Sequence, residues 1–237
     1  MLDIVELRTL LRRNNLACGD NQLELLIKYS ELLVGWNSKI NLISRRDEEN
    51  IVERHIVLSL SFLFKHAFAT GSSILDIGTG GGLPGIPLAI VCPESRFTLI
   101  DSIQKKMKAL TSILDELQMK NVTLRTGRAE DLAKEKEHGG SYDYVVARAV
   151  SGVTDLVKWG GPFLRKAGDG PVEPGRTGTQ PVLQRGSLVL YKGGDLKAEF
   201  AEARLKVKPE LLTEEPITVD GLDPEYTHEK KLVIIKP

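Results

Sequence analysis

The stretch LDIGTGGGLPGIPLAI, residues 75–90, places a cluster of glycines and two prolines between an apolar strand pattern and an apolar helix pattern. Its glycines fit two motifs. Gly78, Gly80 and Gly82 form G-x-G-x-G, whereas Gly80, Gly82 and Gly85 form the G-x-G-x-x-G of dinucleotide-binding loops. In both motifs, glycine lets the backbone turn sharply and approach a ligand above the carboxyl ends of parallel strands. The two motifs predict different cofactors.

The next predicted strand, FTLID, ends in Asp101, nineteen positions after Gly82. A carboxylate at this position can accept hydrogen bonds from both hydroxyls of a ribose. NAD and S-adenosylmethionine both contain such a ribose. Asp101 therefore predicts an adenosine-containing cofactor without choosing between the two.

Three features favour a mononucleoside such as S-adenosylmethionine over a dinucleotide. Asp76 comes two residues before the first glycine, and the helix is expected to begin only at Pro84 or Pro87. Pyrophosphate binding instead requires a helix whose amino end points at the ligand. The loop also follows a long helical region, and the segment TGRAEDL places Ala129, with Glu130 or Asp131, where a polar turn can meet an adenine edge.

Apolar runs of strand length alternate with helical stretches from residue 72 onward. The expected strands are 72–78, 95–102, 121–127, 142–149 and 186–193, with a long helix over 103–119. Because this alternation is typical of a parallel sheet covered on both faces, the predicted fold is α/β, with a Rossmann-like, mostly parallel, doubly wound sheet. Two further runs, 215–220 and 229–237, have only a turn between them and predict a C-terminal antiparallel hairpin at the sheet edge.

The first seventy residues predict helices instead of strands. Apolar residues recur at helical spacing in three places, which predicts three helices. The first lies near the start of the chain, the second follows an expected cap at Asp20 or Asn21, and the third covers 50–67. We therefore predict two domains, an N-terminal helical cap over 1–70 and a larger α/β domain over 71–237.

Residues 168–187 are rich in glycine, proline and polar side chains and show no apolar period. This composition predicts a flexible insertion in the larger domain. Arg176 and Arg185 lie in the segment, so a substrate-binding loop is the alternative.

The composition excludes several classes of protein. Lys plus Arg and Asp plus Glu both count 32, so the net charge is zero and does not indicate an acidic partner. Cys18 and Cys92 are too few for a disulfide framework or a metal knuckle, which indicates a reducing compartment. Without a secretory signal, a membrane-spanning run or a heptad stripe, we expect a cytoplasmic monomer that binds neither membrane nor metal.

Several segments together carry a family resemblance: WNSKINLIS, ERHIVLSL, LDIGTGGGLPGIPLAI, FTLIDSIQKKMKAL, NVTLRTGRAEDL, YDYVVARAV and KKLVIIKP. In these segments, which span most of residues 30–237, the chain resembles the glucose-inhibited division protein B family. These bacterial enzymes are guanine-N7 methyltransferases of small-subunit ribosomal RNA. The resemblance implies S-adenosylmethionine as cofactor, with S-adenosylhomocysteine as its product, and 16S rRNA or the small ribosomal subunit as partner.

The resemblance also implies cofactor contacts from Gly78, Leu83, Ala129, Glu130 and Arg148. With the loop and ribose arguments, the predicted cofactor site comprises Asp76, Gly78, Gly80, Gly82, Leu83, Asp101, Ala129, Glu130 and Arg148.

The chain departs from the family pattern in two places. Leu58 stands where the family commonly has Asp, and the insertion after Gly168 is longer than expected. The first departure puts a polar contact near the cap in doubt.

A guanine-N7 acceptor would need no catalytic base, because N7 already carries a lone pair and no proton leaves before attack. The predicted fourth strand ends in ARAV and lacks the Asn or Asp with Pro-Pro that enzymes acting on exocyclic amines often carry. Arg148 is therefore expected to position the cofactor or the RNA backbone, with a strand-end salt bridge as the alternative. We expect His55 to be a packed or hydrogen-bonded histidine in its helix, and Trp36 to lie in the cap core.

RNA binding requires cations that contact phosphates. Candidates are Lys39, Arg45, Arg46 and Arg54 in the cap, Lys105, Lys106 and Lys108 after Asp101, and Lys158, Arg165 and Lys166 further on, with Asn41 added by resemblance. A solvated helix face is the alternative for each cluster.

Three other functions stay open at this point. The chain could methylate a small molecule or a protein, act as an NAD-dependent oxidoreductase through the G-x-G-x-x-G motif, or bind RNA without catalysis.

Overall fold

A single seven-stranded sheet organises the protein, whose computed structural model describes residues 2–135, 138–165 and 180–237. The strands are β1 (Ser73–Ile77), β2 (Arg96–Asp101), β3 (Val122–Thr126), β4 (Tyr144–Arg148), β5 (Ser187–Gly193), β6 (Leu211–Pro216) and β7 (Lys230–Lys236). Their order is β3-β2-β1-β4-β5-β7-β6. The first five strands are mutually parallel, and β7 is antiparallel to both of its neighbours. The predicted Rossmann-like sheet with a C-terminal hairpin is confirmed.

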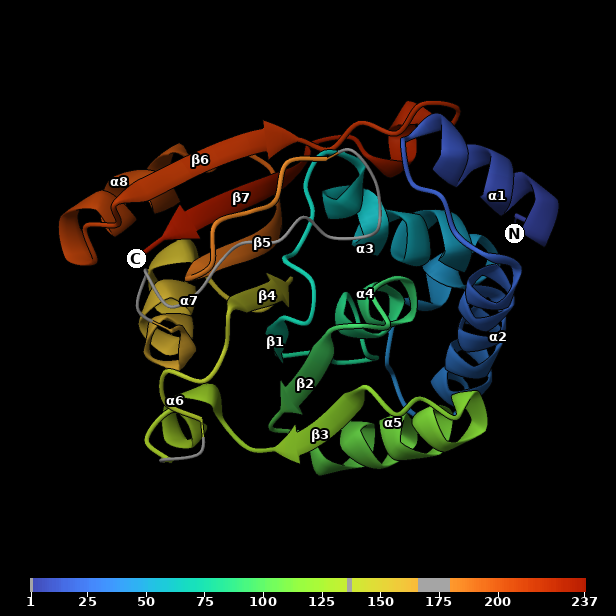
Figure 1. Ribbon diagram of the computed structural model, residues 1–237, viewed down its shortest axis with the longest axis horizontal. Coiled ribbons are helices and arrows are strands. Elements are labelled where there is room, and N and C mark those ends of the chain that lie inside the picture. The colour runs from blue at the N-terminus through green and yellow to red at the C-terminus, as the bar shows by residue number, and fades with distance from the viewer. Residues whose placement is uncertain (1, 136–137, 166–179) are drawn as a thin grey trace.

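Helices cover both faces of the sheet, as Figure 1 shows. On one face lie α1 (Ile4–Arg13), α2 (Asp20–Asn37), α4 (Gly85–Val91) and α5 (Gln104–Leu117). On the other lie α6 (Ala129–Leu132), α7 (Val153–Gly160) and α8 (Lys197–Lys206). The central strand β4 shows why both faces need cover. Tyr144 and Val146 pack into the first core, and Val145 and Ala147 into the second, because successive strand residues point to opposite faces.

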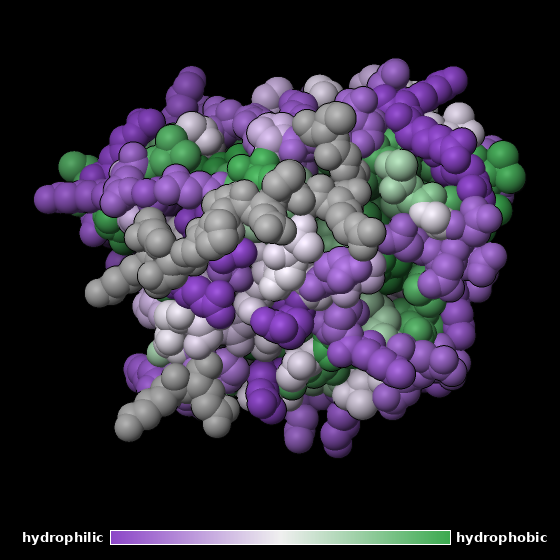
Figure 2. All heavy atoms as spheres, viewed as in Figure 1, coloured by the Kyte–Doolittle hydropathy of each residue, from purple (hydrophilic) through white to green (hydrophobic). Residues whose placement is uncertain are grey.

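The N-terminal helices share the first core with the sheet. Buried leucines of α1 and α2 belong to the same hydrophobic cluster as residues of β1, β2 and α4. Figure 2 shows hydrophilic residues over most of the visible face and a band of hydrophobic residues between the α2 side of the molecule and its centre. The N-cap of α2 lies one residue before Asp20, the first of the two expected caps. Gly19 is its N-cap, and its backbone N–H donates to Gln22 Oε1 at 2.9 Å.

The single helix expected over 50–67 is instead a series of short segments with different pitch. These are η1 (Arg45–Asn50), the π-helix η2 (Val52–Val57), α3 (Leu58–Leu60) and the 3-10 helix η3 (Ser61–Phe64). The carbonyl of His55, inside the π-helix, accepts from Ser59 Oγ at 2.6 Å and from Arg148 Nη1 at 3.4 Å. The same carbonyl also accepts from the Leu58 backbone N–H, so the side-chain donors add to its pairing within the helix.

Two further boundaries differ from prediction. The first strand of the hairpin occupies Leu211–Pro216 rather than 215–220, and Ile217 and Val219 beyond it are buried in the first core. Part of the predicted insertion, 168–179, lies outside the described residues. Its end is packed rather than flexible, because Leu183 N–H donates to the Ala67 carbonyl at 2.8 Å.

Leu33→Ala tests how strongly the N-terminal helices depend on the shared core. Leu33 is fully buried in α2, directly beneath Gly81 of the loop. We expect the substitution to lower the free energy of unfolding by about 2–5 kcal/mol, because the lost contacts leave a cavity. Urea titration measures the change.

Leu205→Ala is the matched control, since Leu205 on α8 is 77% exposed. Its free energy of unfolding should stay within about 0.5 kcal/mol of the wild-type value. Equal losses in both variants would contradict a shared core under the loop.

Candidate functional site

The loop after β1 turns through three glycines in the left-handed region. Gly78, Gly80 and Gly82 have φ of +69°, +57° and +96°. A Cβ at Gly78 would lie 2.6 Å from Val150 Cγ2, and one at Gly82 would lie 2.4 Å from Ile86 Cδ1. The helix α4 begins after them, with Pro84 as its N-cap, as expected. The left-handed turns therefore follow the G-x-G-x-G spacing, while Gly85 allows close packing of α4 on Asp76 and Leu99.

Asp76 lies beneath this loop and is fully buried. Its Oδ2 accepts from Thr79 Oγ1 at 2.6 Å and from Gly85 N–H at 3.0 Å, whereas its Oδ1 has no hydrogen-bond partner among the described residues. Burial raises the pKa of Asp76 to about 7, against the opposing effect of these hydrogen bonds. Asp76 thus holds the loop from below, and its contact with a cofactor stays a prediction.

Asp101 lies at the carboxyl end of β2 and faces the loop. Its Oδ2 accepts from Gly80 N–H and its Oδ1 from Ile103 N–H, both at 2.9 Å. A carboxylate offers about four lone-pair sites, so both oxygens can still accept further hydrogen bonds. Asp101 therefore fixes the loop and remains able to bind two ribose hydroxyls.

A cleft of about 560 Å³ opens above the carboxyl ends of β1, β2 and β4. Seven of the predicted cofactor residues line it: Gly78, Gly80, Leu83, Asp101, Ala129, Glu130 and Arg148. The other two do not line the cleft: Asp76 lies beneath the loop, and Gly82 belongs to the loop. The lining also includes Ile43 and Trp159. No motif in the sequence pointed to these two residues, since a single apolar residue in a helix or loop does not indicate a ligand.

Arg148 joins the sheet to the N-terminal helices at one end of the cleft. Its Nη2 donates to His55 Nδ1 at 2.8 Å, and His55 Nε2 lies 3.2 Å from Asp47 Oδ2. Because a guanidinium can only donate, Nδ1 accepts, the histidine proton resides on Nε2, and Nε2–H donates to Asp47. Burial, followed by the charge of Arg148, lowers the pKa of His55 to about 4, so the ring is neutral at pH 7. This arrangement agrees with a hydrogen-bonded His55 and differs from the salt bridge considered for Arg148.

The residues predicted to bind RNA differ in where the structure places them. Exposed positions are held by Lys39, Asn41, Arg45, Arg46, Lys105, Lys108 and Lys158. Lys106 lines the cleft, and Arg54 lines a neighbouring pocket. Lys166 lies outside the described residues, as does Arg176 of the insertion. Trp36 is partly buried against the first core, as expected, and Lys39 Nζ lies 4.9 Å from its ring centroid.

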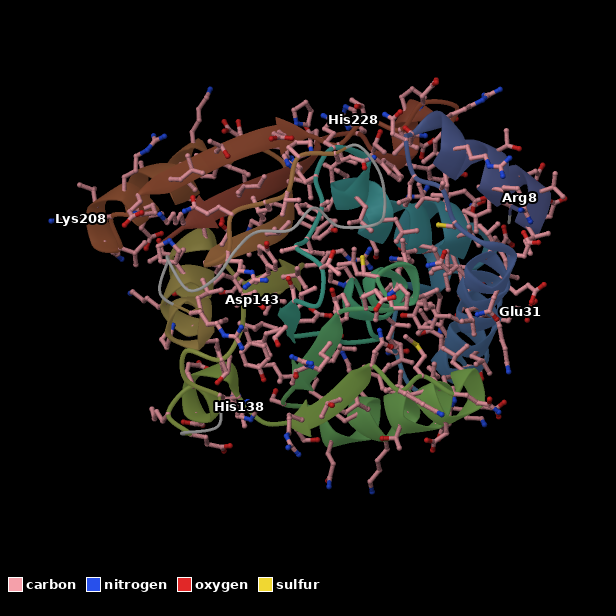
Figure 3. All side chains as sticks on the ribbon, in the orientation of Figure 1. Arg8, Glu31, His138, Asp143, Lys208 and His228 are labelled. Atoms are coloured by element: carbon pink, nitrogen blue, oxygen red, sulfur yellow. The ribbon has the colours of Figure 1, made fainter. Side chains whose placement is uncertain are left out.

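Arg165 lies at the opposite edge of the sheet. It pairs with Asp143, just before the amino end of β4, at 3.1 Å. Arg185 pairs with the same carboxylate at 3.5 Å. In Figure 3, Asp143 lies near the centre of the visible face. Amino ends of parallel strands lie at the edge away from the cleft. The structure therefore does not bring Arg165 or Arg185 to the cleft.

A second pocket of about 300 Å³ adjoins the cleft and shares His55, Arg148 and Ala149 with it. Leu58, where the resembled family commonly has Asp, is buried and lines this pocket with an apolar side chain.

The part of the chain that the structure describes has neither a metal-binding cluster nor a helix that could span a membrane. No group of three or more His, Cys, Asp or Glu side chains there could hold a metal ion. No described helix is long and apolar enough to cross a bilayer.

Comparisons with known proteins agree with this geometry. The family model "GidB: rRNA small subunit methyltransferase G" matches residues 22–171. A Bacteroides fragilis protein named ribosomal RNA small subunit methyltransferase G is 38% identical, over 92% of this chain and 94% of its own. A Chlorobaculum tepidum protein of the same name is 34% identical, over 99% and 98%.

A solved structure described as a SAM-dependent methyltransferase from Aquifex aeolicus has the same fold. Its TM-score is 0.51 at 14% identity, over 84% of this chain and 96% of that one. The family match and the two relatives extend over the cleft, the loop and the N-terminal helices. The chain therefore belongs to the GidB family, rRNA small subunit methyltransferase G.

Proposed function

We propose that this protein transfers a methyl group from S-adenosylmethionine to N7 of a guanine in 16S rRNA of the small ribosomal subunit. The observation that carries the proposal is the glycine loop bound to Asp101 above the carboxyl ends of the strands, in a chain of this family. The proposal includes a monomer that works in the cytoplasm, where its ribosomal substrate occurs.

The cleft suits S-adenosylmethionine in size and chemistry. Its volume of about 560 Å³ lies in the range of small-molecule sites. Asp101 would accept the ribose hydroxyls, and the turn at Ala129 and Glu130 would meet the adenine. A Cβ built at Gly80 would meet only the Gly78 carbonyl, at 4.0 Å, so the floor of the cleft is open there.

When bound, S-adenosylmethionine supplies an electrophilic methyl group on a positively charged sulfur. The residues of this chain then need to orient two reactants rather than to remove a proton, since N7 of guanine already has a lone pair. Orientation alone can lower a barrier by about 7–11 kcal/mol. The neutral His55 accepts hydrogen bonds from the Arg148 guanidinium and holds this cation in a fixed position at the end of the cleft.

The acceptor guanine is expected to be unpaired or turned out of its helix. In A-form RNA, N7 faces a deep and narrow groove that side chains cannot enter. A base that leaves its stack can enter a protein pocket.

Methyl transfer to ribosomal RNA tests the function directly. Labelled S-adenosylmethionine is incubated with undermethylated small subunits and, separately, with their naked RNA. We expect label in N7-methylguanosine after nuclease digestion and mass spectrometry. Absence of label from both substrates, with cofactor binding intact, would contradict the proposal and favour a small-molecule acceptor or a binding-only protein.

Asp101→Ala tests the ribose site. Hydrogen bonds to a charged group contribute about 1.5–3 kcal/mol, so we expect the affinity for S-adenosylmethionine to fall about 10- to 100-fold, measured by calorimetry. Asp115→Ala is the control, because Asp115 is exposed on α5 and does not line the cleft. An unchanged affinity in Asp101→Ala would show that the cofactor binds elsewhere.

The pH dependence of the single-turnover rate tests whether a proton must leave. Asp76→Asn keeps an oxygen for Thr79 and Gly85 but removes a carboxyl whose pKa is raised to about 7. With that titration removed, we expect a methyl-transfer rate that is nearly constant from about pH 6 to 9. A rate in this variant that rose tenfold per pH unit would reveal a general base and contradict the mechanism.

The same pair of proteins gives a stability test. Because the pKa of native Asp76 is raised above its unfolded value of 3.8, the wild-type protein loses stability as the pH rises from about 4 through 7. Asp76→Asn should lack this loss. If the free energies of unfolding of the two proteins changed equally with pH across that range, the assigned titration would be contradicted.

A further inference from the structure

The second pocket lies beyond the cofactor cleft on the same edge of the sheet. The strand order places β5 and β7 directly after β4, whose last residue is Arg148. The cleft spans the carboxyl ends of β1, β2 and β4, and the second pocket continues over the end of β5 at Gly193 and the start of β7 at Lys230. These two residues are paired in the sheet register. The two pockets meet at Arg148 and Ala149.

The charge of the second pocket suits an anion. Its lining contains four cations and one carboxylate: Arg54, Arg148, Lys192, Lys230 and Asp47. Two of the cations have carboxylate partners: Lys192 lies 2.9 Å from Glu199, and Arg54 lies 3.5 Å from Asp47 and 3.6 Å from Glu225. Arg148 donates instead to neutral His55.

Lys230 has no such partner. Its side chain is exposed at the mouth of the pocket and forms no ion pair with any residue that the structure describes. It therefore offers a free ammonium group next to the cofactor cleft, where a phosphate can bind without displacing a carboxylate.

An aromatic ring lines the same pocket. The Arg54 guanidinium carbon lies 4.8 Å from the centroid of the Tyr226 ring. Unstacked bases of RNA bind to aromatic rings and to guanidinium planes of this kind. The cationic mouth of the pocket suits the phosphate of a nucleotide, and the stacking surface beside it suits the base.

The junction with the cleft carries a further sign of function. Ala149 has φ of +55°, which is a strained conformation for a residue with a side chain. On the other side of the junction, His55 lies in a π-helix. Both features are frequent at functional sites.

We infer that the second pocket receives the acceptor nucleotide of the RNA. Its base stacks at Arg54 and Tyr226, its phosphate contacts Lys230, and the purine faces the cofactor cleft across Arg148 and Ala149. The inference rests on the proposed function, because that function makes RNA the substrate.

Lys230→Gln tests the phosphate contact with the full-length chain. Binding of 16S rRNA is measured over a series of salt concentrations, with S-adenosylhomocysteine present so that no transfer occurs. We expect several-fold weaker binding, and a slope of log affinity against log salt that is smaller by roughly 0.7, the value for one contact to single-stranded RNA. The affinity for S-adenosylhomocysteine should not change.

Lys208→Gln is the matched control. Lys208 is also exposed and forms no ion pair with a described residue, but it lies beyond the end of α8 at the far side of the molecule (Figure 3). Its RNA affinity and salt slope should equal those of the wild-type protein. An unchanged affinity and slope in Lys230→Gln would overturn the inference.

Tyr226→Ala and Tyr226→Phe test the stacking surface. Stacking requires the ring and not the hydroxyl, so the Phe variant should retain RNA binding while the Ala variant loses about fivefold or more. Unfolding midpoints and S-adenosylhomocysteine affinity show whether each variant is folded. Equal RNA affinities in two folded variants would overturn the stacking role.

The same measurements separate this inference from the proposed function. RNA binding that depends on Lys230, in a wild-type protein that transfers no methyl group, would support the pocket and contradict only the methyltransferase proposal. Methyl transfer by both the wild-type protein and Lys230→Gln, with the same kcat/KM for small subunits, would support the function and overturn the pocket.

Discussion

The hydrogen bond from the Gly80 backbone to the Asp101 carboxylate is the interaction on which the site depends. It ties the loop after β1 to the end of β2, so the two neighbouring strand ends act as one rigid wall. Asp76 supports the same loop from below through Thr79 and Gly85. The loop can follow this path because its glycines adopt positive φ without steric cost. The Asp101 carboxylate thus fixes the loop beside the cleft and still has lone pairs that can accept hydrogen bonds from a ligand.

Arg148 extends this arrangement toward the N-terminal helices. Its contacts with His55 join β4 to the π-helix η2, so the N-terminal helical region contributes to the site. The neutral histidine satisfies the guanidinium without neutralising its charge. The cation therefore remains available at the junction of the two pockets, where a phosphate or a cofactor carboxylate can approach.

Much of the fold could be predicted from local sequence patterns. The five parallel strands are short apolar runs between helical stretches, a pattern that predicts parallel pairing, whereas their order in the sheet appears only in the structure. Asp101 could be assigned to the cleft because it ends a strand next to the glycine loop. The series of short segments over 50–64 could not be predicted, because its π-helix leaves no local signal in the sequence and its contact with β4 joins residues that are 93 positions apart.

The sequence by itself determined the loop, the strand ends and the family, because these depend on glycine conformation and on residues close together in the chain. Only the tertiary structure decided how the cations are distributed. It pairs Arg165 with the buried Asp143 at the far edge of the sheet, and it places Lys230 in the second pocket that Arg148 also lines. The sequence alone does not distinguish a cationic residue that pairs with a carboxylate from one that faces an open pocket. Its role is set by long-range packing of strands and helices, which a local pattern does not record.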